Sequence, residues 1–135
     1  MVRGASSFAP PMRLRRGSEF RRVLEKGVRM PGPMFLLVAA ENAVGHDRLG
    51  LTVSRRVGGA VLRNRARRLI RESFRRQRRP TGSRPGLDVV VLAARALAER
   101  GQGEVDREFA DRLRRVARRI EQRGRQASAD PHRGV

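Results

Sequence analysis

The densest group of side chains that could do chemistry lies between Ser54 and Arg71, where arginines recur along a predicted helix. Gly58 and Gly59 mark a turn just before this helix, and both glycine-rich turns and helix N-termini favour phosphate groups. Helical spacing brings one amide and four guanidinium groups onto one face: Asn64, Arg67, Arg68, Arg71 and Arg75. The chemistry predicted for this face is phosphate binding.

Acidic residues do not neutralise this face. Glu72 is the only acid between Asp47 and Asp88. Like charges one helical turn apart cost roughly a few tenths of a kcal/mol per pair. Phosphate binding offsets that cost because it releases counterions. A merely solvated helix face would interleave glutamates with its arginines, so the pattern favours a polyanionic ligand.

The charge of the whole chain points to the same kind of partner. Its 135 residues contain 32 Lys and Arg against 13 Asp and Glu, a net charge of +19 that no folded arrangement can neutralise internally. Lys26 is the only lysine. Arginine offers the bidentate contacts and stacking that lysine lacks, although codon bias would produce the same excess.

No catalytic constellation and no protein metal site are expected. The absence of Cys excludes disulfides, thiolate metal sites and cysteine nucleophiles, and it fits a reducing compartment. His46 and His132 are isolated, and the acids do not gather at metal-ligand spacing. Asp88 opens a predicted strand, so we interpret it as structural rather than as a ligand or general base.

The sequence gives no indication of membrane insertion or export. Its longest apolar run, 34–40, is far shorter than the roughly 20 residues that a membrane span requires. The N-terminus lacks the hydrophobic region of a signal peptide. We therefore expect a cytoplasmic protein.

Hydrophobic periodicity predicts three helices and three strands around a loop at 77–87. The helices are expected from an N-cap at Ser18 to a stop at Gly27, over 60–76 with Leu62 on the apolar side, and over 104–122; the strands are expected at 34–40, 48–54 and 88–93. Strand 34–40 is apolar on both faces, so both faces should be covered. A helix between the last two strands suggests a β-α-β unit, and the pattern favours an α+β two-layer sandwich.

The chain is predicted to form one domain over 13–122, which is about the size that its 39% apolar residues can support. Residues 1–12 lack hydrophobic periodicity and are predicted to be a disordered arm. Either Met1 or Met12 could be the initiator. Residues 123–135 are polar and are predicted to be a disordered tail, with Gly124 ending the last helix.

A specific resemblance now appears in these residues. The turn Ser54-Arg55-Arg56-Val57-Gly58, followed by Arg63-Asn64-Arg65 on a helix, resembles the protein subunit of bacterial ribonuclease P, and the likeness spans about Arg13 to Ile120. It implies an α-β sandwich with a four-stranded sheet and a left-handed β-α-β crossover carrying the Arg-Asn-Arg helix. It also implies that an RNA subunit, using Mg²⁺, removes the 5′ leader of precursor tRNA, and that the protein itself binds no cofactor.

The resemblance further implies two RNA-binding surfaces. The face toward the catalytic RNA would comprise Arg55, Arg63, Asn64, Arg65, Arg68 and Arg71. A cleft between the first helix and the sheet would bind the leader through Phe20, Leu24, Leu36, Val38, Thr52, Arg56 and Arg67. Two residues depart from the family pattern: Val38 stands where an aromatic is often found, and Gly59 where Asn is usual. Phe20 is the one obvious base-stacking candidate, although ordinary core packing explains it equally well.

The expected partners are therefore the catalytic RNA and precursor tRNA, with no membrane and no obligate protein partner. A ribosomal or assembly protein is the main alternative, because such proteins are also small and arginine-rich; it would need no leader cleft. A DNA-binding protein is less favoured, since no helix-turn-helix arrangement is evident. With +19 on so small a core, we also predict that the chain is partly unfolded in low salt and folds when anions bind.

Overall fold

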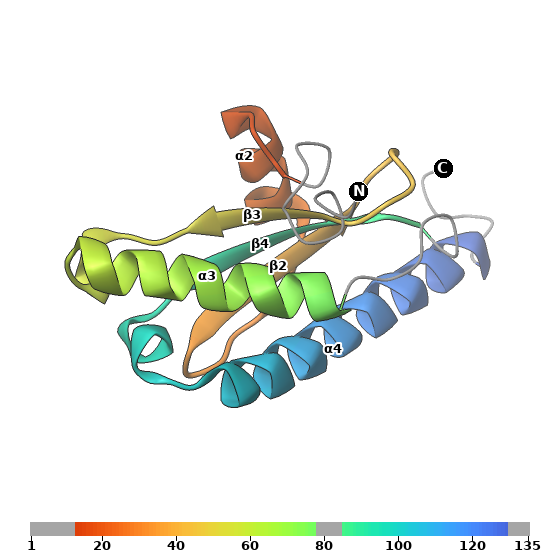
Figure 1. Cartoon of the computed structure of the whole chain (residues 1–135). Helices are drawn as coiled ribbons and strands as arrows, with labels where there is room; N and C mark the ends of the chain where they lie inside the picture. Colours follow the sequence, from red (N-terminus) through yellow and green to blue (C-terminus); the bar gives the residue numbers. More distant parts are fainter. Residues whose placement is uncertain (1–12, 78–84, 130–135) are drawn as a thin grey trace, which may run out of the picture.

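The computed structural model describes residues 13–77 and 85–129 (Figure 1). Their elements, in chain order, are helix α2 (Gly17–Lys26), strands β1 (Val28–Met30), β2 (Phe35–Glu41) and β3 (Arg48–Thr52), the 3-10 turn η2 (Arg55–Val57), helix α3 (Ala60–Gln77), strand β4 (Leu87–Ala93), the 3-10 turn η3 (Arg95–Glu99) and helix α4 (Gln102–Ala129). The α+β class and the three predicted helices are confirmed.

The strands form one four-stranded sheet in the order β1-β2-β4-β3. β2 is antiparallel to both β1 and β4, whereas β3 and β4 are parallel. Parallel neighbours need a crossover connection, and α3 supplies it, so the β-α-β unit read from the sequence is confirmed. The left hand of this crossover stays a prediction.

Strand β2 is covered on both faces, as its apolar alternation predicts. Phe35, Leu37 and Ala39 belong to the main core, which α3 and α4 cover. Leu36, Val38 and Ala40 face the other way, where α2 crosses the sheet (Figure 1). The sheet therefore makes a sandwich with α3 and α4 and carries a smaller apolar cluster under α2.

Three phenylalanines hold the main core together. Phe109 of α4 lies between Phe35 of β2 and Phe74 of α3, with ring centroids 6.2 and 6.4 Å away. Such tilted and edge-to-face pairs stabilise a core beyond the burial of their area. The ring of Phe109 therefore connects the sheet to both helices of the sandwich.

Helix α2 begins differently from the sequence prediction. Ser18 lies within the helix, and the N-cap is Arg16. The carboxylate of Glu19 accepts hydrogen bonds from the backbone N–H groups of Arg15 and Arg16, both at 3.2 Å. Glu19, at the third position of the helix, thus reaches back to the N–H of the N-cap residue as the acid of a capping box does, and the predicted N-cap at Ser18 was wrong. The predicted stop at Gly27 is confirmed.

Helix α4 is longer than predicted. It runs to Ala129 rather than to 122, so the boundary of the tail at 123 was wrong for residues 123–129. Gly124 lies inside the helix. A single glycine costs a helix only about 1 kcal/mol relative to alanine, and the neighbouring arginines and glutamines are good helix formers. The predicted arm at 1–12 and the remainder of the tail, 130–135, lie outside the described residues.

Two further details escaped the sequence patterns. The edge strand β1 pairs Val28 with Ala39 and Met30 with Leu37, but three residues are too few to show a period. Leu62, predicted on the apolar side of its helix, is 40% exposed. The first turn of α3 packs against Gly58 instead of the sheet, which explains the exposure of Leu62.

The described part of the chain contains no helix that is both long enough and apolar enough to cross a bilayer.

Candidate nucleic-acid interface

The turn that leads into α3 has a specific requirement for one of its two glycines. Gly58 has φ 145°, and a Cβ atom there would lie 2.5 Å from Cδ1 of Leu62. At Gly59 a Cβ would meet nothing within 4 Å. The turn therefore needs glycine at 58 for conformation and space, whereas position 59 has room for a side chain.

A groove runs along the outward face of α3. Its lining contains all five residues that the helical spacing placed on one face, together with a residue from the N-terminal segment and one acid: Asn64, Arg67, Arg68, Arg71, Arg75, Arg13 and Glu72. The common face predicted from the sequence is thus confirmed. We call this set the α3 groove.

Arg13 reaches the α3 groove because its segment lies along the edge of the sheet. Arg13 forms a parallel bridge with Leu49 of β3, and the N–H of Leu14 donates to the carbonyl of Leu49 at 3.0 Å. Leu14 is buried in the apolar cluster under α2. Arg13 was not predicted as a site residue, since the single apolar residue beside it, Leu14, gives no strand signal.

The electrostatics of the α3 groove are those of an incompletely neutralised cationic site. The pKa of Arg71 is lowered, first by burial of its guanidinium and then by the nearby charges of Arg13 and Arg67. Glu72 forms ion pairs with Arg75 and, at 2.9 Å, with Arg76, so its carboxylate is engaged at the C-terminal end of the groove. An anion bound near Arg71 would remove this repulsion.

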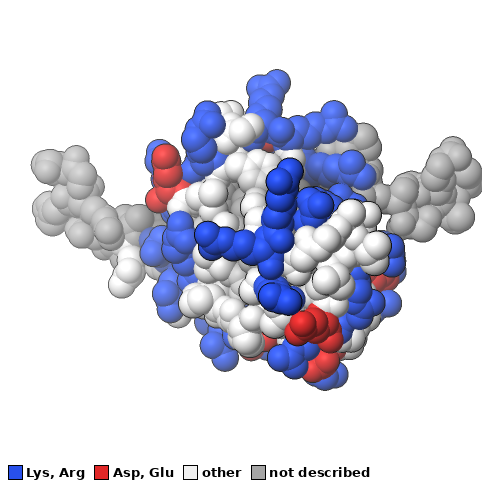
Figure 2. All heavy atoms as spheres, turned by 90° about the vertical axis from the view of Figure 1, so that its left-hand side faces the viewer, with Lys and Arg blue, Asp and Glu red and all other residues white. Residues whose placement is uncertain are grey.

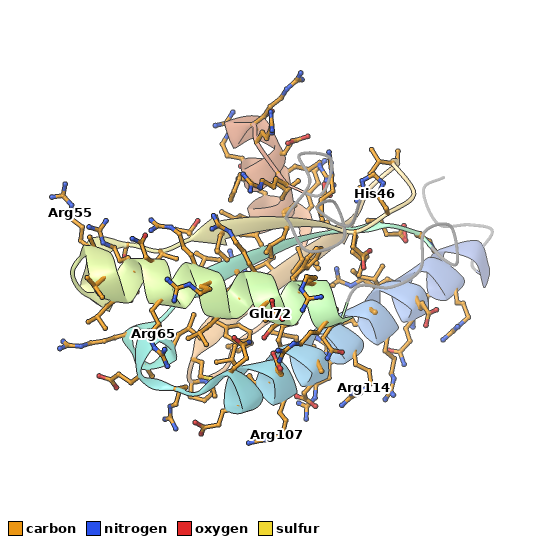
Figure 3. The ribbon with its side chains drawn as sticks, viewed as in Figure 1. His46, Arg55, Arg65, Glu72, Arg107 and Arg114 are labelled. Atoms are coloured by element: carbon orange, nitrogen blue, oxygen red, sulfur yellow. The ribbon has the colours of Figure 1, made fainter. Side chains whose placement is uncertain are left out.

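Arg65 belongs to a different environment from its neighbours on α3. Its Nε donates to the carbonyl of Ala98 at 2.8 Å, and its Nη2 donates to the carbonyl of Arg100 at 2.7 Å. Figure 3 shows Arg65 on the side of α3 that faces η3, away from the projecting Arg55. Arg65 therefore ties α3 to η3, and a role for it in binding RNA stays a prediction.

Arg63, Arg55 and Arg56 lie near the start of α3. Arg63 is half-buried, and its Nε has no hydrogen-bond partner within the described ranges. Arg55 and Arg56 are exposed on η2, where the hydroxyl of Ser54 accepts from the N–H of Arg56 at 3.3 Å. In the end-on view of this region, lysine and arginine predominate over a few acidic groups near the margin (Figure 2).

A second candidate surface lies on the sheet face next to α2. The strand register aligns Leu36, Leu92 and Thr52 in one row across β2, β4 and β3. Leu36 and Leu92 are half-buried and Thr52 is exposed. We call this row the sheet strip. Leu92 was not predicted as a site residue, and its alignment with Thr52 follows only from the register.

The neighbouring row lies underneath α2. Val38 and Val90 are fully buried, and Gly50 completes the row on β3. Phe20 of α2 covers this glycine: a Cβ at position 50 would lie 2.7 Å from Cζ of the Phe20 ring. Val38 therefore lies in the core beneath α2 and offers no exposed surface for a base.

The structure brings together part of the predicted cleft. Phe20 and Leu24 are half-buried and pack in the same apolar cluster as Leu36, with Thr52 exposed on the same sheet face. Arg67 instead lines the α3 groove, where its Nη1 donates to Asn64 Oδ1 at 2.9 Å. The ring of Phe20 packs on the cluster and remains partly exposed, so it takes part in core packing, and its role in base stacking stays a prediction.

Asp88 has the structural role assigned to it. Its carboxylate is fully buried and accepts two hydrogen bonds from Arg48, at 2.8 and 2.9 Å, one from Asn42 at 2.8 Å, and one from Arg22 of α2. A buried carboxylate needs such partners. This network fixes α2 on the sheet and therefore positions Phe20.

His46 occupies a turn before β3 (Figure 3), as predicted, whereas His132 lies outside the described residues. Within residues 13–77 and 85–129, no three His, Cys, Asp or Glu side chains are grouped so that they could hold a metal ion.

Fold and surface together define a small, basic α+β protein whose arginine groove suits phosphate groups. Comparison with known proteins agrees with this description. The family model described as Ribonuclease P matches residues 8–120, so the chain belongs to the ribonuclease P protein family. This result confirms the resemblance found in the sequence.

Individual relatives agree with this assignment. The chain is 37% identical over 127 residues to the ribonuclease P protein component of Azotobacter vinelandii, covering 93% of this chain and 95% of the relative. The RNase P protein of Thermotoga maritima has a similar fold, with a TM-score of 0.65 and 28% identity over 77% of this chain and 96% of that one. A Staphylococcus aureus RNase P protein gives a TM-score of 0.63 and 28% identity over 79% and 93%.

Proposed function

We propose that this chain is the protein component of a ribonuclease P ribonucleoprotein, and that it assists removal of the 5′ leader from precursor tRNA by binding RNA. The observation that carries the proposal is the α3 groove, where the partly buried guanidinium of Arg71 lies close to the charges of Arg13 and Arg67. A cluster of this kind gains most from a ligand that brings several phosphates at once.

The catalytic RNA would bind along the outward side of α3 and η2. Arg68, Arg71 and Asn64 line the groove, and Arg55 extends the positive surface beyond it. Arg63 has a buried Nε that lacks a partner among the described residues, so a phosphate oxygen would complete its hydrogen bonds. Arg65 would act indirectly, by holding α3 against η3.

The single-stranded leader would lie on the sheet strip beside α2. Unpaired nucleotides bind surfaces that combine apolar or aromatic platforms with nearby positive charge. Phe20, Leu36 and Leu92 provide half-buried apolar area, Thr52 provides a hydroxyl, and Arg56 provides charge. Because Val38 is buried, Phe20 is the platform on which base stacking would depend.

Hydrolysis would be carried out by the RNA with Mg²⁺ held through the RNA. The arginines of the protein would neutralise phosphates where catalytic RNA and precursor tRNA approach each other, and this should lower the Mg²⁺ concentration that the reaction needs. The complex would act in the cytoplasm.

The direct test is cleavage of a precursor tRNA at low Mg²⁺ by a bacterial ribonuclease P RNA, with and without this protein. The protein alone should be inert, and it should restore accurate 5′ cleavage when the RNA is present. An RNA that binds the protein tightly yet gains no activity would contradict the proposal and favour an assembly role.

The leader surface is tested separately with Phe20→Ala and a conservative control, Phe20→Leu. Phe20→Ala should weaken binding of a precursor that carries its leader and spare one that lacks it. Phe20→Leu keeps apolar packing but removes the aromatic ring, so it separates stacking from core stability. Equal losses for both precursors would assign Phe20 to the core alone.

A further inference from the structure

Helix α4 continues well beyond the core that it covers. Ile120 is the last residue of α4 that packs against the core, and residues from Gln122 to Gln126 are exposed. At a rise of 1.5 Å per residue, the segment from Gln122 to Ala129 is about 10 Å of helix. Core packing does not account for this length.

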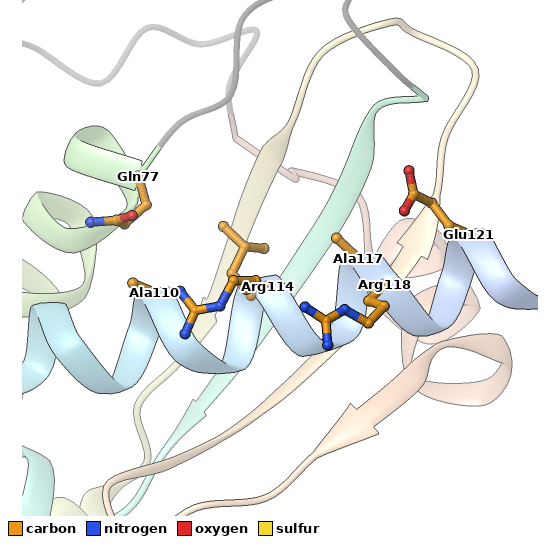
Figure 4. A pocket seen from close by; sticks show the side chains of 7 residues that line it. Gln77, Ala110, Arg114, Ala117, Arg118 and Glu121 are labelled. Carbon is orange, nitrogen blue, oxygen red and sulfur yellow. The ribbon is translucent and has the colours of Figure 1, made fainter.

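The outer side of α4 carries arginines along most of its length. Arg107, Arg114, Arg118 and Arg125 recur at intervals of seven, four and seven residues, which places them on one face. Figure 3 shows Arg107 and Arg114 pointing away from the sheet, and Figure 4 shows Arg114 and Arg118 on the same side of α4 beside a shallow pocket at the end of α3. Arg119 and Arg123 extend the positive charge around the helix.

The acids near this face are already engaged. Asp111 pairs with Arg112 at 2.6 Å, with Arg115 at 3.2 Å and with Arg114 at 3.4 Å. Across the described ranges, no ion pair is found for Arg118, Arg119, Arg123 or Arg125. Arg114 and Arg118, Arg115 and Arg119, and Arg119 and Arg123 are like charges four residues apart, which destabilises a free helix.

The helix dipole does not explain this distribution. Cations are favoured within the last turn of a helix, but the last turn of α4 contains no basic residue. Arg118 and Arg119 lie about three turns before Ala129. The arginines are therefore placed for a partner outside the chain.

We propose that residues 107–125 of α4 form a further RNA-binding surface, separate from the α3 groove and the sheet strip, which binds the phosphate backbone of a folded RNA; we call it the α4 surface. The only aromatic residue of α4, Phe109, is fully buried, so this surface has no platform for unpaired bases. Base-paired RNA is recognised through its shape and its phosphates, which a row of guanidinium groups can bind. The inference rests on the proposal that RNA is the partner and assigns it a further contact.

The test compares two triple variants with equal charge loss. Arg118→Gln, Arg119→Gln and Arg123→Gln remove charge from α4 and keep a good helix former. Arg15→Gln, Arg21→Gln and Lys26→Gln remove the same charge from exposed positions at α2. Binding of a bacterial ribonuclease P RNA transcript is measured over a range of salt concentrations, and circular dichroism checks that each variant is folded.

The α4 variant should bind the RNA about tenfold more weakly or worse. The slope of its log affinity against log salt concentration should decrease by the equivalent of about two to three phosphate contacts. The affinity of the α2 variant should change by less than about threefold. Equal losses of affinity in the α4 and α2 variants would overturn the proposed α4 surface and leave the proposed function intact. If the wild-type chain fails to bind the RNA, the proposed function falls and this inference with it.

A position-specific measurement completes the test. The chain has no Cys, so Arg119→Cys and Arg68→Cys each provide a unique attachment point for a photo-activated cross-linker. Cross-links from the two positions to different RNA segments would support two surfaces. No specific cross-link from position 119, or cross-links from both positions to the same segment, would overturn the proposal.

Discussion

The ring of Phe20 lies directly over Gly50, so close that a Cβ atom at position 50 would be 2.7 Å from its Cζ. Helix α2 can approach the sheet at this point only because β3 has no side chain there. The ion pairs of the buried Asp88 with Arg22 of α2 and with Arg48 of β3 provide a second attachment of α2 to the sheet. The exposed part of Phe20 is therefore positioned by its neighbours on the sheet.

Gly50→Ala should lower the free energy of unfolding by about 1–3 kcal/mol, because the added methyl group must displace the Phe20 ring. Urea unfolding provides the measurement. The matched control is Gly103→Ala on α4, where the nearest atom to a Cβ is 3.8 Å away; this change should be neutral or stabilising. If Gly50→Ala is as stable as the wild type, the close contact is wrong.

Arg65 and Arg68 should behave oppositely when each is replaced by alanine. Arg65→Ala removes two hydrogen bonds to backbone carbonyls and should cost about 1–2 kcal/mol of stability. Arg68 is exposed in the α3 groove, so Arg68→Ala should change stability by less than about 0.5 kcal/mol while weakening RNA binding. Urea unfolding and RNA titration of both variants separate the effects; a destabilised Arg68→Ala would contradict this division.

Asp106 should make the stability of the α3–α4 contact depend on acid pH. Burial raises the pKa of its carboxyl, but hydrogen bonds from Ser73, Gln102 and Arg76 outweigh this, and the pKa is lowered from 3.8. A carboxyl whose pKa is lowered in the folded state stabilises the protein at pH values above its pKa in the unfolded state. This stabilisation is lost as the pH falls through the pKa in the folded state. The free energy of unfolding should therefore be level at neutral pH and fall below about pH 4.

Asp106→Asn supplies the test for that pH dependence. The variant should be less stable than the wild type at pH 7, and its stability should decline less steeply in acid. Glu99→Gln, a change at an exposed position of η3, is the control and should leave the profile unchanged. Parallel profiles for Asp106→Asn and the wild type would show that this carboxylate does not contribute.

Sulfate should stabilise the chain through the α3 groove. An anion that binds only the folded state raises stability with its concentration, and such an anion would offset the repulsion that Arg71 experiences from Arg13 and Arg67. We predict a rise in Tm with sulfate that is reduced in Arg67→Gln/Arg71→Gln. A complete, cooperative fold by circular dichroism in low-salt buffer without multivalent anions would contradict the predicted need for anions.

The sequence predicts an element best where a hydrophobic or charge pattern extends over many residues. The alternation of strand β2 and the arginine face of α3 both appear in the structure as expected. The end of α4 was missed because Gly124 resembles a stop signal, yet a helix tolerates one exposed glycine. Strand β1 was missed because pairing with β2, rather than local pattern, creates it.

Site residues were harder to predict where tertiary contacts decide their role. Arg65 lies in the motif beside Asn64, but its side chain reaches the carbonyls of η3, which are more than thirty residues away in the chain. Arg13 joins the α3 groove through a bridge to the edge of β3. Val38 shares the face of Leu36 and yet is fully buried, because its row lies underneath α2. None of these contacts leaves a periodic signal in the sequence.

The arginines of this chain fall into two groups with different tolerance of substitution. Arg48 makes two directed hydrogen bonds to the Asp88 carboxylate and a third to Glu19, and Arg65 makes one to each of two backbone carbonyls. A planar guanidinium can make both bonds at once, and a lysine ammonium cannot reproduce that geometry. Exposed residues such as Arg68 and Arg118 mainly supply charge, which lysine supplies equally well. Replacement of arginine by lysine should therefore be tolerated at many exposed positions but not at Arg48 and Arg65.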